Sequence, residues 1–407
     1  MHILLLTLGL VLFATVLQDS FQTIILPRRP VARFRLTRLF FVATWTPWTR
    51  IVHLCRDHRR REQLYSFYGP LSLLLLFAFW AVSLITAFAF IYFGLHVPFV
   101  DPWHPVTVLG RLRSCFYVSG STLFTLGLGD VVPASHAARF LVVVECGTGL
   151  GFVALVIGYL PVLYTAFSAR EMAVALLDAR AGSPPTAGEL LVRHQFDGGA
   201  KALTDLLAEW ERWCATLLET HISYPILCYY RSQHDNQSWL SALTAILDTC
   251  ALLITAVEGS VQRQVQRQAQ LTFAVGRHVL VDIGHVFHRE KAELRLRQAP
   301  FTRLNDDEFS HLGTLLYEGG ISLCSDVNVR ARLDALRLLY ESHACAMAHY
   351  LRLDLPRWTP PPPNPGKPDI WTSVARLRSP AGSVTPLQSH VSPQATASNF
   401  GDEDGFL

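Results

Sequence analysis

The chain has 407 residues, of which 50% are hydrophobic and 16% are charged, whereas about 25% of the residues in an average soluble domain are charged. Its mean hydropathy of +0.27 requires long apolar stretches, which excludes a wholly soluble and a wholly disordered protein. The net charge of +3 is too small to indicate a nucleic-acid partner. Only three of the 35 basic residues are Lys, which indicates a GC-rich, bacterial coding sequence.

Three segments are apolar and long enough to cross the roughly 30 Å hydrocarbon core of a bilayer. They are His2–Leu17, Leu71–Leu95 and Ala137–Ala166. The first segment has no Lys or Arg before its apolar run and no small-residue cleavage site, so we interpret residues 1–26 as an uncleaved span. A cleaved signal peptide is the alternative.

A basic belt follows the first span. The stretch from Pro27 to Glu62 contains ten Arg and only two acidic residues, so the positive-inside rule predicts that residues 27–66 are cytoplasmic. Within it, residues 39–54 are apolar but short, and their flanks are basic. We expect this stretch to lie in the membrane interface, with Trp45 and Trp48 at headgroup depth and the Arg residues on anionic lipid. The alternative is a buried helix of the soluble part.

A glycine-containing motif lies between the second and third spans. It reads Thr125, Leu126, Gly127, Leu128, Gly129, Asp130. Alternating Gly residues reach positive φ without steric cost, which lets successive carbonyl groups point the same way. A ring of such carbonyl groups can replace the water around a cation.

This region resembles the potassium-channel pore family, whose filter reads T-V-G-Y-G-D or a close relative and lies between an outer and an inner helix. The resemblance covers residues 71–166, with residues 113–124 in the place of the pore helix, Pro133 after the filter, and Gly147, Gly149 and Gly151 in the place of a gating hinge. It implies a pore domain over residues 67–166 that passes potassium ions and needs no cofactor. The resemblance also implies stacked cation sites formed by the carbonyl groups of Thr125, Leu126, Gly127 and Leu128 and the Thr125 hydroxyl, with Asp130 at the outer mouth.

The sequence departs from the family pattern at three positions. Leu128 replaces a Tyr or Phe, which predicts looser potassium selectivity, and Ser121 and Tyr117 replace a Glu and a Trp of well-known bacterial members. We expect Glu145 to compensate by bonding to the pore helix at Ser119 or Ser121, because an ionisable group within a span is costly unless it is paired. A protonated Glu at a helix interface is the alternative.

The third span carries Leu150, Val153, Ala154 and Ile157 at spacings of three and four, which predicts an apolar stripe facing a cavity. We assign the hinge and cavity to Gly149, Val153, Ile157 and Pro161, because Pro bends a helix; a static kink at Pro161 is the alternative. One pore loop cannot encircle an ion, so we expect a homotetramer.

Residues 167–355 are more polar and indicate an all-α cytoplasmic domain. No G-x-G-x-x-G motif and no series of short strands appears there. The expected helices are Ser168–Arg180, Thr186–Arg193, Ala200–His221, Ser238–Gly259, Val261–Arg297, Asp306–Ser325 and Val329–Arg352. Residues 239–257 are apolar enough for a fourth span, but the central Asp248 favours a buried bundle helix.

A metal site is a weaker candidate in the same domain. His278, Asp282 and His285 fall at i, i+4 and i+7 of an expected helix, which places three possible ligands on one face, although we assign no firm metal site. Residues 356–407 are rich in Pro and end in acidic residues, so we expect a disordered tail.

The sequence therefore predicts an all-α membrane protein with a potassium-channel-like pore domain, an extra N-terminal span and an all-α cytoplasmic domain. The expected function is a tetrameric potassium channel, multi-pass in a bacterial plasma membrane, with a cytoplasmic C-terminus and gating by the inner helix and the cytoplasmic domain. The alternatives are a non-conducting scaffold or receptor and a membrane-tethered metal-binding protein. No enzyme motif is found, and no cytoplasmic ligand or protein partner is predicted.

Overall fold

The computed structural model describes residues 2–26, 36–102, 107–196, 198–232, 237–257, 262–287, 303–324 and 326–361. Most of these residues are helical. The strands β1 (Phe99–Val100) and β2 (Val132–Pro133) form one short antiparallel pair. The predicted all-α fold class is confirmed for the described residues.

Three helices are long and apolar enough to cross a membrane: α1 (His2–Ile24), α3 (His58–Gly94) and α5 (His136–Ala181). They contain the three predicted spans, but α3 begins earlier and α5 ends later than predicted. The Asp57 side chain caps α3 by accepting a hydrogen bond from the Arg59 N–H at 3.1 Å. The predicted separate helix Ser168–Arg180 is wrong, because the chain continues there as the last part of α5.

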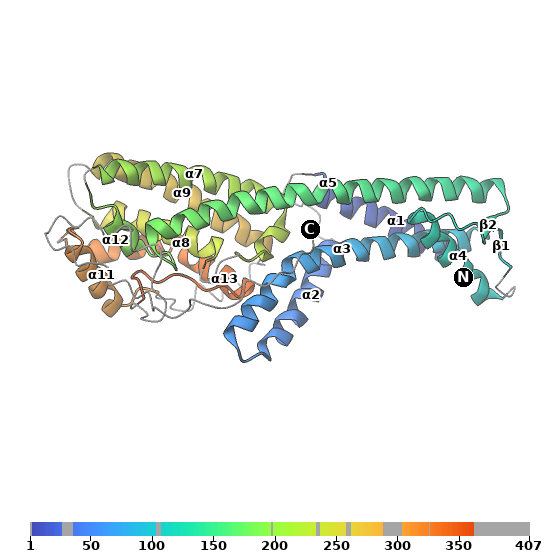
Figure 1. Cartoon of the computed structure of the whole chain (residues 1–407), viewed down its shortest axis with the longest axis horizontal. Coiled ribbons are helices and arrows are strands. Elements are labelled where there is room, and N and C mark those ends of the chain that lie inside the picture. Colours follow the sequence, from blue (N-terminus) through green and yellow to red (C-terminus); the bar gives the residue numbers. More distant parts are fainter. Residues whose placement is uncertain are drawn as a thin grey trace, which may run out of the picture.

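The N-terminal helix α1 packs along α3 (Figure 1). Its Asp19 is buried, and the carboxylate accepts hydrogen bonds from the Thr37 N–H at 3.0 Å, the Thr37 hydroxyl at 2.5 Å and Trp80 Nε1 at 3.0 Å. These bonds join the end of α1 and the start of α2 (Leu36–His53) to the middle of α3. The helix α1 is therefore a packed member of the membrane part.

The two Trp residues of helix α2 pack against other parts of the protein. Trp45 is 5% exposed, its Nε1 donates to the Tyr350 carbonyl oxygen at 3.1 Å, and its ring lies 4.6 Å from that of Tyr68 and 5.1 Å from that of Tyr229. Trp48 is half-buried against the same core. Trp45 therefore contacts aromatic partners from distant segments rather than lipid headgroups. Arg28, Arg29, Arg33 and Arg35 of the basic belt lie outside the described residues.

The remaining helices form a C-terminal bundle around the end of α5 (Figure 1). They are α6 (Ala187–Arg193), α7 (Gly199–Ser223), the 3₁₀ helix η1 (Pro225–Tyr229), α8 (Trp239–Thr255), α9 (Gln262–Phe287), α11 (Asp306–Glu318), α12 (Val329–Arg337) and α13 (Glu341–Leu351). Helix α8 is buried from Trp239 to Leu253, so its apolar sequence serves the bundle core rather than a fourth span. The predicted single helix Val329–Arg352 is wrong, because a turn at Leu338–Tyr340 divides it.

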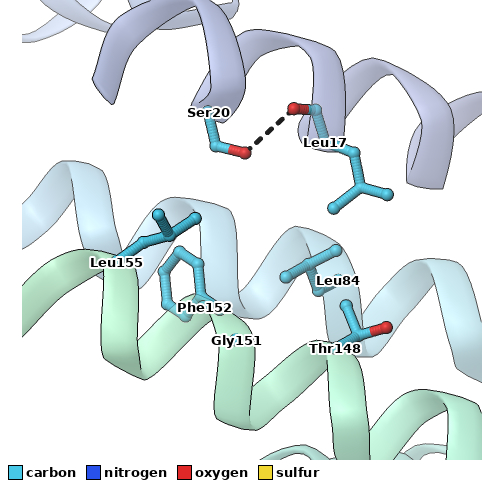
Figure 2. Close-up of a pocket in the computed structure, with 7 residues that line it drawn as sticks. All are labelled: Leu17, Ser20, Leu84, Thr148, Gly151, Phe152 and Leu155. Carbon is cyan, nitrogen blue, oxygen red and sulfur yellow. Dashed lines mark hydrogen bonds between the residues drawn. The ribbon is translucent and has the colours of Figure 1, made fainter. Parts of the chain in front are cut away.

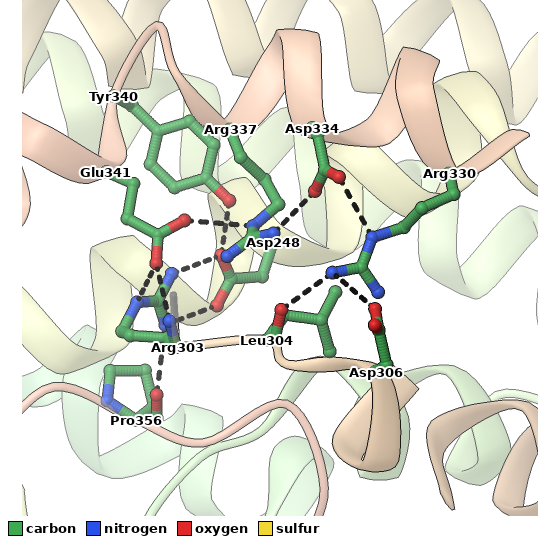
Figure 3. Close-up of polar contacts among 10 residues, drawn as sticks. All are labelled: Asp248, Arg303, Leu304, Asp306, Arg330, Asp334, Arg337, Tyr340, Glu341 and Pro356. Atoms are coloured by element: carbon green, nitrogen blue, oxygen red, sulfur yellow. Dashed lines mark hydrogen bonds and ion pairs between the residues drawn. The ribbon is translucent and has the colours of Figure 1, made fainter. Parts of the chain in front are cut away.

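Asp248, a charged residue within α8, belongs to a buried polar network (Figure 3). The two Asp248 carboxylate oxygens accept hydrogen bonds from Arg303 at 2.8 and 2.9 Å, and the Tyr340 hydroxyl also donates to Asp248. Glu341 lies 3.2 Å from Arg303 Nε. Burial alone disfavours the guanidinium charge, but Asp248 and Glu341 outweigh burial and raise the pKa of Arg303. The network therefore joins α8, α13 and the segment before α11 through paired charges.

The bundle extends beyond its predicted end at residue 355. Trp358 is fully buried, and the guanidinium carbons of Arg303 and Arg337 lie 5.8 and 5.6 Å from its ring centroid. The Pro356 carbonyl oxygen accepts a hydrogen bond from Arg303 at 2.9 Å. The start of a disordered tail at residue 356 is therefore wrong, whereas residues 362–407 lie outside the described residues.

Candidate ion-conduction site

The candidate site begins with a short helix that enters the space between the two pore spans. Helix α4 (Val108–Leu123) is capped by Thr107, whose hydroxyl oxygen accepts a hydrogen bond from the Gly110 N–H at 3.0 Å. It includes the predicted pore helix but begins five residues earlier, at this cap. Its end is tied to the next segment, because the Leu126 N–H donates to the Ser121 carbonyl oxygen at 2.8 Å.

The candidate filter, Thr125–Asp130, has an alternating backbone. Thr125, Gly127 and Gly129 have φ values of 56°, 60° and 77°. A backbone that alternates between positive and negative φ lets successive carbonyl groups point to one side, and only Gly adopts positive φ without cost. Leu126 and Leu128 are 62% and 63% exposed in the single chain. The segment therefore has a backbone conformation that could line a path with carbonyl groups, and its Leu side chains are exposed in the single chain.

The far end of the candidate filter is held by a hydrogen bond to α4. The Tyr117 hydroxyl donates to Asp130 Oδ2 at 2.6 Å, and Asp130 Oδ1 accepts from the Val131 N–H at 3.1 Å. The β1–β2 pair joins the segment after the filter to the segment that follows α3. Tyr117, which replaces a Trp of well-known bacterial members of the resembled family, thus connects Asp130 to the pore helix.

Glu145 lies behind the candidate filter and is fully buried. Its carboxylate accepts hydrogen bonds from the hydroxyl groups of Ser119 on α4 and Tyr92 on α3. The Ser119 hydroxyl also lies 3.0 Å from the Ile85 carbonyl oxygen. Of the two partners considered for Glu145 from the sequence, the structure places Ser119 there, and Ser121 supports the filter through its carbonyl group. Sequence reasoning missed Tyr92, whose only signal was a hydroxyl group within an apolar span.

The inner helix α5 is continuous through Gly149 and Pro161, two of the residues assigned to the hinge and cavity. Gly149 is buried, and a Cβ atom there would collide with the Leu123 carbonyl oxygen at the end of α4. Gly149 is therefore a close-packing position in a continuous helix, and its assignment to a hinge stays a prediction. Val153, Ile157 and Pro161 are exposed in the single chain, on a face that does not pack against the chain's own helices.

A groove of about 420 Å³ lies between α1, α3 and α5 (Figure 2). It is lined by Leu17, Ser20, Leu84, Thr148, Gly151, Phe152 and Leu155. Its hydroxyl groups bond within their own helices, Ser20 to the Leu17 carbonyl oxygen at 3.1 Å and Thr148 to the Val144 carbonyl oxygen at 2.8 Å. The groove therefore presents an apolar surface without a charged group and does not resemble a cation site.

The candidate metal ligands do not assemble into a site. His278 Nε2 and Asp282 Oδ2 on α9 are 3.2 Å apart, and His285 follows one turn later with an exposed side chain. Among the residues that the structure describes, no group of three or more His, Cys, Asp or Glu side chains is arranged to hold a metal ion. The contact of His278 with Asp282 is instead a pair between adjacent turns of one helix.

Arg170 of α5 forms hydrogen bonds with the segment of the C-terminal bundle that follows α7. Arg170 is 3% exposed and donates to the carbonyl oxygens of Leu227 and Tyr230, both at 2.8 Å, and lies 3.2 Å from His221 Nε2. Burial and the charge of Arg170 lower the pKa of His221 well below 6.5, so His221 is neutral and can accept this hydrogen bond. The Tyr230 ring packs against Gly69 of α3. The segment after α7 therefore contacts both pore spans.

Comparison with known proteins places this geometry in context. Residues 71–165 match the model of a protein family described as an ion channel. The matched residues include the apolar part of α3, the helix α4, the candidate filter and the apolar part of α5. No curated protein and no solved structure matches the chain. The chain thus contains a potassium-channel-like pore domain within a membrane protein.

Proposed function

Since residues 71–165 form an ion-channel pore domain, we propose that the protein is a tetrameric, potassium-selective channel that conducts through Thr125–Gly129. The observation that carries this proposal is the alternation of positive φ at Thr125, Gly127 and Gly129 directly after a pore helix. A single filter segment cannot surround a cation, whereas four copies around one axis supply four carbonyl groups at each level. The exposure of Leu126 and Leu128 in the single chain fits contact with such copies.

The contacts around the candidate filter support a preference for potassium, although the residues behind the filter differ from those of well-known bacterial potassium channels. Glu145 connects the pore helix to α3 and α5, and Tyr117 holds Asp130 at the outer mouth. Leu128 offers no hydroxyl group for a bond behind the filter, so its width depends on the other contacts. We therefore expect potassium to be preferred over sodium, but less strictly than with an aromatic residue at position 128.

The C-terminal bundle is suited to influence gating. Helix α5 runs without interruption from the candidate filter into the bundle (Figure 1), and Arg170 fixes it to the segment that also contacts α3. A movement of the bundle would therefore act on the inner ends of both pore spans. The Arg-rich segment after α1 supports a cytoplasmic location of this bundle by the positive-inside rule.

Rubidium uptake into proteoliposomes that contain the full chain tests the proposal. We expect uptake by the native protein, and loss of uptake in Gly129→Ala, because a Cβ atom is strained at a φ of 77°. Gly120→Ala is the matched control, since a Cβ atom there meets only Ile85 Cδ1 at 4.0 Å. Tetramers without any uptake would instead support a non-conducting scaffold, and a purely monomeric protein would contradict both.

A further inference from the structure

The inner helix α5 is much longer than a membrane span. Its 46 residues extend about 69 Å at 1.5 Å per residue, against a hydrocarbon core of about 30 Å. Its last part carries two large apolar side chains on the surface, Met172 with 64% and Leu176 with 61% exposure. Both lie beyond Arg170, whose bonds to η1 and Tyr230 place this part of α5 in the C-terminal bundle. Lipid therefore does not account for their exposure.

The two residues continue a face that begins beside the candidate filter. Residues eleven positions apart lie three turns apart on nearly the same side of a helix. This spacing aligns Met172 with Leu150 and Pro161, and Leu176 with Ala154 and Thr165, and the structure leaves all six exposed. The opposite side of the same helix is buried in the chain's own core at Phe167, Arg170, Val174 and Leu177. One exposed face thus extends over most of α5.

The surroundings of Leu176 indicate that an apolar side chain from another molecule could pack against it. A hollow of about 50 Å³ lies between the end of α5 and α7, and Ala173, Leu176, Trp210 and Trp213 contribute to its lining. This volume is too small for most ligands. Its edge carries an exposed ion pair, in which Arg180 and Glu209 are 3.6 Å apart.

We propose that Met172 and Leu176 are covered by α5 of neighbouring copies of this chain, so that the copies also contact one another below the membrane. A second copy is the occupant because the same face, at Leu150 and Pro161, lies beside the pore where copies must meet. The inference rests on the proposed tetramer and adds an interface that the filter does not require. It makes the lower half of α5 part of the assembly rather than a free surface.

Oxidative cross-linking of Leu176→Cys in the full chain, within native membranes, tests this interface. We expect covalent dimers well above the background of the native protein, which contains eight Cys residues. Leu338→Cys is the matched control, because Leu338 is 77% exposed at the end of α12 and lies outside the proposed interface. A yield for Leu176→Cys no greater than that for Leu338→Cys would overturn the inference.

A charge substitution gives an independent measurement. Leu176→Glu brings like charges together at the proposed interface, so we expect a smaller tetramer fraction in native mass spectrometry of the detergent-solubilised protein, while Leu338→Glu keeps the native fraction. An unchanged tetramer in Leu176→Glu would count against the interface. If the native protein is tetrameric and takes up rubidium but both Leu176 tests fail, this inference falls and the proposed channel stands. If the native protein neither assembles nor conducts, both fall.

Discussion

The carboxylate of Glu145 on the inner helix accepts a hydrogen bond from the hydroxyl of Ser119 on the pore helix, and the Tyr92 hydroxyl on α3 donates to the same carboxylate. One buried side chain therefore connects the three helices that surround the candidate filter. Buried polar groups stabilise a fold only where their partners are present, so the position of the pore helix depends on this connection.

Glu145→Gln tests that dependence. The amide keeps only one acceptor oxygen, so we expect the Tyr92 hydroxyl to lose the acceptor for its proton, while Ser119 retains the Ile85 carbonyl oxygen. A buried hydroxyl group without a partner costs about 1–3 kcal/mol. We expect a lower midpoint for thermal dissociation of the tetramer and altered rubidium flux. Thr148→Val is the control, because its hydroxyl bonds only to its own helix; an unchanged midpoint together with unchanged flux would refute the role of Glu145.

Leu128→Tyr tests the proposed basis of selectivity. An aromatic ring at this position can pack against the pore helix and hold the filter at a fixed width. We expect a several-fold increase in the potassium-to-sodium permeability ratio, measured by reversal potentials in mixed solutions. Leu126→Val serves as the control, because it alters a similarly exposed filter side chain without adding a ring. The same ratio in Leu128→Tyr and the native protein would show that position 128 does not set selectivity.

Arg170→Gln tests the connection between the bundle and the pore. The substitution removes charged hydrogen bonds to Leu227 and Tyr230, each of which contributes about 1.5–3 kcal/mol. We expect slower rubidium uptake with an unchanged potassium-to-sodium ratio, because the inner ends of α3 and α5 lose their common anchor. Arg332→Gln, which removes a partly exposed ion pair with Asp326 elsewhere in the bundle, should behave as the native protein. Equal uptake by both variants would mean that the bundle does not act through Arg170.

Asp248→Ala tests the buried network of the bundle. Removing one partner of a buried ion pair leaves the other charge uncompensated and typically costs about 3–5 kcal/mol. We expect that loss in the free energy of unfolding by urea, followed by Trp fluorescence because Trp358 lies over Arg303. Arg332→Ala breaks a more exposed pair with Asp326 and should cost less than about 1 kcal/mol. Comparable losses in the two variants would contradict a special role of the Asp248–Arg303 pair.

The sequence alone was sufficient for features that depend on local patterns. The three spans follow from continuous apolar composition, and the alternating glycines at 127 and 129 indicate the filter because positive φ is a property of the residue itself. The lengths of α3 and α5 were underestimated, since apolar composition ends near the membrane surface whereas backbone hydrogen bonding continues through charged residues.

Only the tertiary structure decided which distant residues meet. It paired Glu145 with Ser119 and Tyr92, brought Trp45 to Tyr350, and placed Trp358 close to two Arg side chains. It also separated candidates that share a helix face, since His278, Asp282 and His285 form no described metal site. The physical reason is that the energy of a buried polar or aromatic group depends on its partners, and these come from remote segments whose approach no local spacing specifies.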